Sequence, residues 1–514
     1  MDKKKGLLNV IVSISFKLIF LIAGIVVRRF VIKYLGIEVN GLNSLYISLL
    51  DFLAVAELGV GSAITFCMYK PIVENDNNKV SALYNLFTKL YLIIGAIIAA
   101  GGCILMPILK YLAKDYQDIN VNLYLTFALM LISVVMTYPF SSKTSLINAY
   151  KNNYITTIIS NIGQLIQSGL QIIVLIFTQS FVWFLVCRII SSAFQWIATE
   201  IIARIKYGDI IKNRQKTDSH TNHEVVKSVR AMFMHKIGGI LVNTADSVII
   251  SAFIGVVLLG KYSNYTSIMV AMTGVITLFF TPLTSVIGHM CVERDTEGIK
   301  KYLNFFHAFN FVVGTVFFLG YYAIIDNLVT ICFGSNLELA KTISFVITLN
   351  YFIQFMRQAT LLFRDATGTF YNDRWKPLVE GLINIGLSIL FVKVFPQEYN
   401  IVGVIVATII TNIFICHVVE PYVLYKHALQ TRATNYYIRN YIYIVIFICS
   451  LIALHFCMRS YDNDWLELLV NGSISIAISI APILIVLAVN KDFRQHIKVF
   501  FSRLKAKLRS RVDN

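Results

Sequence analysis

The sequence predicts an all-α integral membrane protein with about 14 transmembrane helices, in two pseudo-symmetric six-helix lobes plus two extra C-terminal helices. The composition is 57% hydrophobic and 14% charged, whereas soluble domains carry about 25% charged residues. The apolar runs are continuous and do not alternate, so they favour helices over the strands of a barrel. An internal repeat, described below, indicates the two lobes.

The predicted spanning helices are apolar runs close to the length of about 20 residues that crosses a hydrocarbon core of about 30 Å. In chain order they are residues 7–29, 42–67, 83–109, 121–140, 154–178, 181–203, 231–254, 262–289, 303–325, 342–363, 378–395, 400–425, 436–458 and 465–489. Polar and charged residues separate these runs. The chain is therefore expected to pass through the bilayer repeatedly.

The expected helices fall into groups of six, six and two, and the longest polar interruption separates the first six from the others. The predicted parts are an N-lobe at 1–205, a basic cytoplasmic linker at 206–229, a C-lobe at 230–425, a helix pair at 426–489 and a basic cytoplasmic tail at 490–514. Lys and Arg concentrate in the linker and the tail. Because cytoplasmic loops retain positive charge, both termini are expected in the cytoplasm. The net charge of +17 is therefore attributed to topology and anionic lipid, and nucleic-acid binding is not expected.

Two segments indicate a parallel internal repeat. YLGIEVNGLNSLYIS (Tyr34–Ser48) aligns with FIGVVLLGKYSNYTS (Phe253–Ser267), and 219 residues separate them. The same interval separates Lys17 from Lys236. A second pair of similar segments lies later in each half, INAYKNNYITTIISNIG and TFYNDRWKPLVEGLINIG. Repeated lobes of this kind place a substrate site at their interface in transporters.

Several of these segments resemble one known family. Arg28-Arg29 followed by YLGIEVNGLNSLY, together with GTFYNDRWKPLVEGLINIGLSIL and IVGVIVATIITNIF, resembles the bacterial polysaccharide flippases. These proteins export O-antigen and capsule repeat units and belong to the multidrug/oligosaccharidyl-lipid/polysaccharide exporter superfamily. The resemblance extends over essentially the whole chain.

The resemblance implies a flippase and not an enzyme. Such a protein translocates undecaprenyl-diphosphate-linked oligosaccharide across the bacterial cytoplasmic (inner) membrane by alternating access, through a cavity of cationic character. Membrane lipid and the lipid-linked oligosaccharide are the expected partners, and a polysaccharide polymerase and assembly proteins are candidate partners. No cofactor or metal is expected, and coupling to an H+ or Na+ gradient remains open.

Five basic residues are candidates for a cationic substrate cavity. They are Lys17, Arg28, Lys236, Arg188 and Arg357, and each falls in or near a predicted spanning helix. A cation at the bilayer centre costs at least about 2.5–3.5 kcal/mol, so it normally faces a cavity or a partner. The alternatives are structural ion pairs for the two lysines and, for Arg28 and Arg357, side chains that extend to the membrane interface.

Acidic and polar residues supply two further candidate sets. Asp51, Glu57 and Asp246 are expected intramembrane carboxylates that couple transport to H+ or Na+, neutralise the basic residues or contact substrate sugars. Asn161, Gln164, Ser168 and Gln171 follow one another at intervals of three, four and three, which forms one helix face. That face would suit sugar hydroxyls, and interhelical hydrogen bonds explain it equally well.

Two other functions remain open from the sequence. A multidrug/ion antiporter of the same superfamily would favour acidic cavities for cationic drugs, whereas the repeat-related residues here are lysines. A membrane polysaccharide polymerase or ligase would need a sizeable external loop, and the longest one expected here, near 326–341, is short. No GxxxxGK[ST] motif is present, so ATP hydrolysis by this chain has no support.

Overall fold

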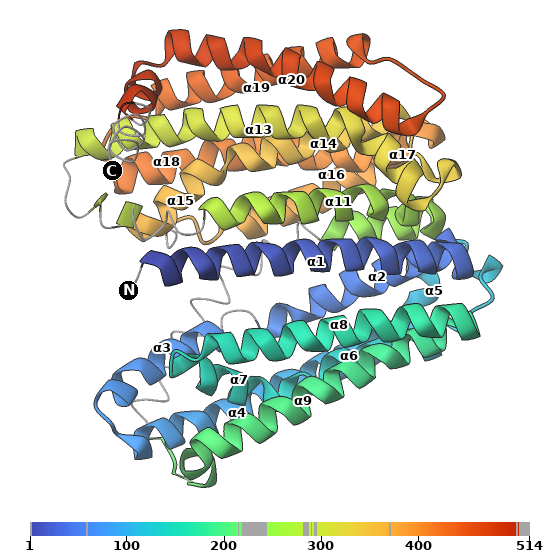
Figure 1. The fold of residues 1–514 in the computed structure, drawn as a ribbon, viewed down its shortest axis with the longest axis vertical. Helices are drawn as coiled ribbons and strands as arrows, with labels where there is room; N and C mark the ends of the chain where they lie inside the picture. Colours follow the sequence, from blue (N-terminus) through green and yellow to red (C-terminus); the bar gives the residue numbers. More distant parts are fainter. Residues whose placement is uncertain are drawn as a thin grey trace, which may run out of the picture. The chain divides into compact units, whose positions relative to one another are not determined.

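The computed structural model describes residues 3–57, 60–213, 215–217, 244–280, 287–288, 290–291, 296–369, 372–499 and 502. These residues form helices joined by short turns and contain no β-strand, so the predicted all-α class is confirmed (Figure 1). Among them, nine helices are long and apolar enough to cross a membrane. The protein is accordingly a multi-pass membrane protein, whereas the expected total of 14 helices remains a prediction.

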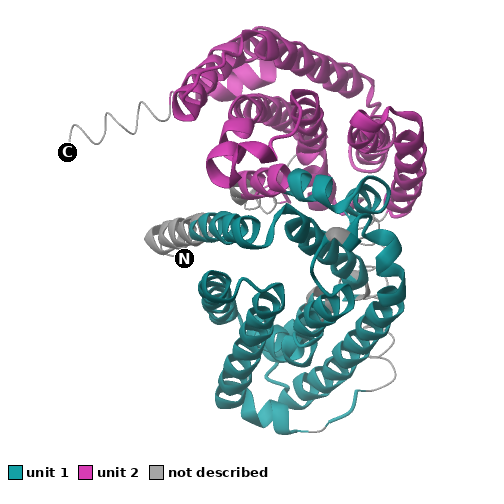
Figure 2. Cartoon of the chain, turned by 90° about the vertical axis from the view of Figure 1, so that its right-hand side faces the viewer, with its two compact units in different colours: residues 1–263 teal, residues 264–514 magenta. Residues whose placement is uncertain are grey.

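The chain forms two compact units, residues 1–263 and 264–514 (Figure 2). The boundary falls inside one helix, α11 (Val256–Phe280). Most of the predicted linker at 206–229 and of the seventh predicted helix at 231–254 lies outside the described residues, as do residues 503–514 of the tail. The predicted division into lobes therefore stays a prediction.

Unit 1 consists of long helices and short helical breaks. In chain order these are α1 (Lys3–Leu35), α2 (Ile37–Leu53), η1 (Ala54–Glu57), α3 (Val60–Val73), α4 (Asn77–Leu105), η2 (Met106–Ile108), α5 (Leu109–Leu112), η3 (Tyr116–Asp118), α6 (Leu123–Val135), α7 (Tyr138–Ala149), α8 (Asn153–Thr178), α9 (Phe181–Lys212), the π-helix η4 (Ile250–Ile254) and the start of α11. Helix α1 packs against α2 and α8, and α8 also packs against α9.

Unit 2 begins within α11 and continues to the C-terminus. Its further helices are α13 (Thr296–Phe333), η5 (Ser335–Leu337), α14 (Lys341–Met356), α15 (Gln358–Thr367), α16 (Lys376–Val394), η7 (Gln397–Tyr399), α17 (Asn400–Thr411), the π-helix η8 (Asn412–Cys416), α18 (His417–His427), α19 (Thr434–Cys457) and α20 (Asp464–Val489). Helix α13 packs against α14, α19 and α20, and α16 pairs with α17. The last two helices thus join unit 2 through α13.

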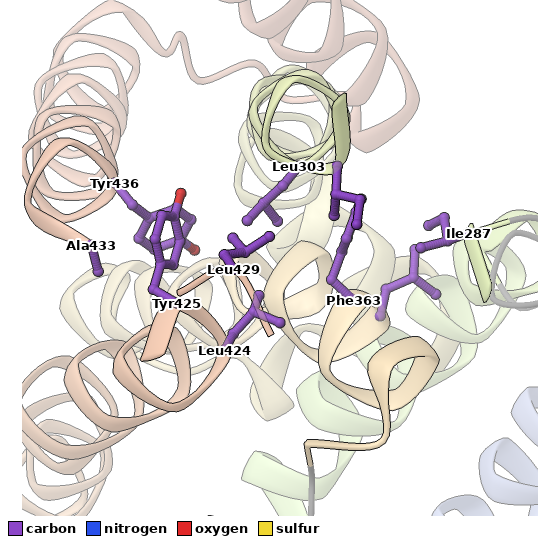
Figure 3. Close-up of a cluster of buried hydrophobic side chains, with 10 residues drawn as sticks. Ile287, Leu303, Phe363, Leu424, Tyr425, Leu429, Ala433 and Tyr436 are labelled. Carbon is purple, nitrogen blue, oxygen red and sulfur yellow. The ribbon is translucent and has the colours of Figure 1, made fainter. Parts of the chain in front are cut away.

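A cluster of buried apolar side chains fixes one end of unit 2 (Figure 3). Leu303 comes from α13, Phe363 from α15, Leu424 and Tyr425 from α18, and Tyr436 from α19. The rings of Tyr425 and Tyr436 lie with their centroids 5.8 Å apart. Four helices, of which only α18 and α19 are consecutive in the chain, therefore share one core at this end.

Some predicted helices match the structure within one residue, and others are interrupted. The runs 154–178 and 465–489 correspond to α8 and α20. In contrast, the run 342–363 is broken at Arg357, between α14 and α15, and the run 400–425 contains the π-helix η8. Interruptions inside membrane helices occur where neighbouring groups satisfy the freed backbone, and both of these lie at polar residues whose contacts are described below.

Candidate substrate-binding site

The two segments of the internal repeat form the same local structure. Gly36 separates α1 from α2 with φ +92°, and Gly255 separates η4 from α11 with φ +143°. Residues other than glycine rarely adopt such positive φ values. Each repeat therefore uses a glycine to end one helix and to begin the next at once.

The repeat-related helices α2 and α11 cross with their backbones almost in contact. A Cβ atom on Gly41 would lie 1.9 Å from the backbone oxygen of Val256, and one on Gly260 would lie 2.5 Å from the backbone oxygen of Ile37. Ile37 and Val256 are themselves 219 residues apart, as are Gly41 and Gly260. The crossing is therefore reciprocal, and the repeated glycines make it possible.

Arg28 joins this crossing from α1. Its Nη1 donates to the hydroxyl of Ser263 on α11 at 2.9 Å, and the side chain is partly buried. Asn40 on α2 donates from Nδ2 to the backbone oxygen of Gly260 at 3.2 Å and to the Ser263 hydroxyl at 3.3 Å. Unlike the glycine contacts, these hydrogen bonds have no repeat-related copy, because residues 247 and 259 are Ser and Leu. The cationic group of Arg28 is thus held within unit 1.

The two lysines that the repeat relates are not shown with their side chains. Lys17 lies in α1, and its side chain is not among those that the structure describes, whereas Lys236 lies outside the described residues altogether. Their proposed role therefore stays a prediction. The backbone does place Lys17 on the helix that packs against α8.

The structure describes contacts for two of the three carboxylates that are predicted to lie within the membrane. Asp51 on α2 interacts electrostatically with Arg188 on α9. Glu57 in η1 accepts a hydrogen bond from the Tyr138 hydroxyl at 2.9 Å. Asp246 is 8% exposed. The described contacts therefore link Asp51 to a cation and Glu57 to a phenol.

The four predicted sugar contacts on α8 divide into two kinds. Gln171 is buried and donates from Nε2 to the backbone oxygen of Phe184 at 3.3 Å. Asn161, Gln164 and Ser168 are partly or fully accessible, and none has a hydrogen bond within the described part of the chain. Amide and hydroxyl groups in a spanning helix are costly without a polar partner. Three of the four therefore retain the capacity to bind a ligand or water.

Unit 2 contains a buried cluster of charges around Arg357, which we did not predict as a cluster. Arg357 donates from Nε and Nη2 to the two carboxylate oxygens of Glu420, at 3.1 and 2.6 Å, and from Nη1 to Oδ1 of Asn412 at 2.7 Å. Glu420 lies on α18 and Asn412 begins η8. The breaks at Arg357 and at η8 therefore meet at one polar contact.

Lys376 completes this charge cluster, which consists of Arg357, Lys376, Glu380 and Glu420. The Lys376 Nζ atom lies 2.6 Å from Oε1 of Glu420 and 3.0 Å from Oε2 of Glu380. Glu420 is 1%, Glu380 4% and Lys376 8% exposed. Two cations and two carboxylates balance, and such burial is tolerated when each charge has a partner. Two features of the sequence could have indicated this cluster. They are the spacing of four residues between Lys376 and Glu380 and the position of Glu420 within an apolar run.

A second buried pair lies nearby in the chain. Arg364 donates from Nη1 to Oδ2 of Asp373 at 2.9 Å and contacts Asp365 at 3.1 Å. Asp373 is 4% exposed. These contacts tie the end of α15 to the segment before α16. No group of three or more His, Cys, Asp or Glu side chains suited to a metal occurs among the described residues.

Comparisons with known proteins show similarity in fold. The sequence matches no protein-family model, and no curated protein matches it. Among solved structures, the chain is similar to the lipid II flippase MurJ in an inward closed conformation, with a TM-score of 0.62, 13% identity and coverage of 95% of this chain and 100% of that chain. It is also similar to an inward-facing multidrug resistance MATE family transporter of the MOP superfamily, with a TM-score of 0.52, 14% identity and coverage of 77% and 92%. The chain therefore has the fold of these transporters.

Proposed function

We propose that this protein is a flippase that moves undecaprenyl-diphosphate-linked oligosaccharide repeat units across the bacterial cytoplasmic membrane for surface polysaccharide synthesis. The observation that carries the proposal is the packing of two helices in unit 1, one with polar side chains and one with basic residues. Helix α8 bears Asn161, Gln164 and Ser168 without hydrogen bonds in the described part of the chain, and it packs against α1, which bears Lys17 and Arg28. Polar groups and cations together suit a substrate that combines sugars with a diphosphate.

The fold similarity supports this class of substrate. One similar solved structure is a flippase of lipid II, and the sequence motifs resemble the polysaccharide flippases. In the proposed mechanism the polyprenyl chain stays in lipid, while the diphosphate and sugars cross along a hydrated path with cationic groups. Alternating access then exposes that path to one side of the membrane at a time.

The five basic residues are proposed to have different roles. Lys17, Lys236, Arg28 and Arg188 are proposed to line the path, the first two as point charges for the diphosphate. Arg357 is also a candidate, and its bidentate contact with Glu420 favours a structural role for it instead. Asp51, Glu57 and Asp246 are proposed either to couple transport to H+ or Na+ or to neutralise these cations.

A multidrug/ion antiporter is the second candidate function. The similarity in fold to a multidrug resistance transporter favours it. The two functions differ in the charge of their substrates, because an undecaprenyl diphosphate is anionic and many exported drugs are cationic. Replacing the basic residues should therefore impair the flippase and should leave or improve export of cations.

Complementation tests the proposed function. Cells that lack their own polysaccharide flippase would express the wild type, Lys17→Ala, Lys236→Ala or the double variant at matched levels, with Lys110→Ala/Lys393→Ala as a control at two exposed lysines. We expect the wild type and the control to restore surface polysaccharide. The double variant should instead accumulate the lipid-linked repeat unit inside the cell. Full export by the double variant would contradict the cationic path, and drug resistance without polysaccharide export would favour the antiporter.

A further inference from the structure

A cavity of about 420 Å³ lies within unit 1, and none of the charged and polar residues considered so far lines it. The end of α1, the start of α2, the segment before α6 and the turn between α8 and α9 surround it. Its polar lining consists of Tyr34, Glu38, Asn120, Asn122, Gln179 and Ser180. The volume falls in the range of about 300–1,000 Å³ that is usual for small-ligand sites.

The ends of the surrounding helices position these side chains around the cavity. Gln179 ends α8 in the left-handed conformation, with φ +48°, so that the chain turns directly into α9. Asn122 caps α6 by accepting a hydrogen bond from the Leu125 N–H at 3.0 Å, and its amide nitrogen donates to none of the residues that the structure describes. Tyr34 stacks on Phe30 with ring centroids 5.9 Å apart. The cavity is therefore formed at the ends of helices and not by a long loop.

The lining has unused hydrogen-bonding capacity. Within the described part of the chain, the side chains of Glu38, Asn120, Gln179 and Ser180 make no hydrogen bond or ion pair, and neither does the Tyr34 hydroxyl. Amides and hydroxyls both donate and accept, and a carboxylate accepts. Vicinal sugar hydroxyls also donate and accept. The cavity lining thus matches the hydrogen-bonding pattern of a carbohydrate.

Charge distinguishes a carbohydrate from a phosphate as the ligand. Glu38 is the one charged side chain in the lining. Beside the lining, Nζ of Lys33 lies 5.2 Å from the centroid of the Tyr34 ring. A diphosphate or a phospholipid headgroup requires several donors and net positive charge, and Glu38 offsets the single charge of Lys33. A neutral or amino sugar has no such requirement.

We propose that this cavity is a carbohydrate subsite that binds sugar rings of an oligosaccharide. The inference rests on the proposed function for the identity of that oligosaccharide and for its position on the outer side, where the predicted topology places this end of α1. There the cavity would hold the sugars after they cross and disfavour their return. None of the residues proposed for the basic path lines the subsite, so the sugars and the diphosphate would contact different side chains.

Direct binding tests the subsite. The full chain in lipid nanodiscs would be titrated with water-soluble repeat-unit oligosaccharide, released by mild acid from the lipid-linked precursor of the host cells, and followed by saturation-transfer NMR and calorimetry. The variants are Asn120→Ala, Gln179→Ala and both together, with Gln397→Ala as an exposed control in unit 2. All of these side chains lack hydrogen bonds in the described structure, so the variants should fold.

We expect the wild type and the control to bind equally, each single variant to bind about threefold to tenfold more weakly, and the double variant at least tenfold more weakly. Inorganic diphosphate should not compete. Equal binding by the double variant, no binding by the wild type at millimolar oligosaccharide, or competition by diphosphate would each overturn the proposal.

The complementation experiment separates failure of the subsite from failure of the proposed function. If the wild type restores export but does not bind the soluble oligosaccharide, the subsite proposal fails and the flippase proposal stands. If the wild type binds the oligosaccharide through Asn120 and Gln179 but never restores export, the subsite proposal stands and the flippase proposal fails.

Discussion

At the scale of single residues, the buried charges of unit 2 are best explained as structural. Arg357 and Lys376 share Glu420, and Lys376 also contacts Glu380. Removing one member of a buried, balanced cluster leaves an uncompensated charge, which typically costs about 3–5 kcal/mol. We therefore expect Glu420→Gln to lower the thermal unfolding temperature of the detergent-solubilised protein markedly, as followed by size-exclusion chromatography after heating.

The matched control for that substitution is Glu398→Gln, an exposed carboxylate that should be neutral. A second variant keeps the charges balanced. Lys376→Met/Glu380→Leu removes one cation and one anion and leaves the Arg357–Glu420 pair intact, so it should destabilise far less than Glu420→Gln. If Glu420→Gln unfolded at the wild-type temperature, the cluster would not be a stabilising element.

The polar row on α8 allows a second test with two glutamines on one helix. Gln171 is buried and bonded to the Phe184 backbone oxygen, whereas Gln164 has no hydrogen bond in the described structure. Gln171→Ala should lower stability by about 1 kcal/mol with little specific effect on export. Gln164→Ala should leave stability unchanged and reduce export by roughly threefold to tenfold. Identical effects of both variants on stability and export would contradict this division.

At the scale of helices, the crossing of α2 and α11 depends on two glycines. A Cβ atom on Gly41 would meet backbone and not a movable side chain, since it would lie 1.9 Å from the oxygen of Val256. We expect Gly41→Ala and Gly260→Ala each to cost about 1–3 kcal/mol through overpacking. Unfolding temperature and export would both be measured for each variant.

Gly169→Ala is the control for this pair, because nothing lies within 4 Å of a Cβ atom at that position of α8. Alanine favours a helix over glycine by up to about 1 kcal/mol, so this control should be neutral or stabilising. Equal stability of Gly41→Ala and Gly169→Ala would mean that the close crossing is not required.

The sequence predicted helices more reliably than helix breaks. Continuous apolar residues identify α8 and α20 because the bilayer demands such runs. The interruption at Arg357 could not be predicted, because it depends on Glu420 and Asn412, which lie 63 and 55 positions away along the chain. The repeat of Gly36 with Gly255 was visible in the sequence, but only the structure shows that both have positive φ and that Gly41 and Gly260 make reciprocal contacts.

The candidate site was predicted less completely than the fold. Periodicity placed Gln171 and Gln164 on one face, yet a helix period cannot tell which of them a neighbouring backbone oxygen satisfies. The cavity beside Tyr34 and Gln179 was not anticipated, since its lining comes from three separate stretches of the chain that meet only at helix ends. Sites assembled from distant segments need the tertiary structure before their members can be identified.

At the scale of the whole molecule, the central claim is transport of an anionic lipid-linked oligosaccharide along a basic path. The most direct measurement is flipping in proteoliposomes that contain only the purified protein and undecaprenyl-diphosphate-linked oligosaccharide. A membrane-impermeant glycosidase added outside would report the accessible fraction over time. At the start, substrate in the inner leaflet is protected from the glycosidase. The account predicts that the wild type makes this protected pool accessible and that Lys17→Ala/Lys236→Ala does so much more slowly. A protected pool that persists with the wild type, in vesicles where the same protein exchanges a cationic drug for H+ or Na+, would contradict the account.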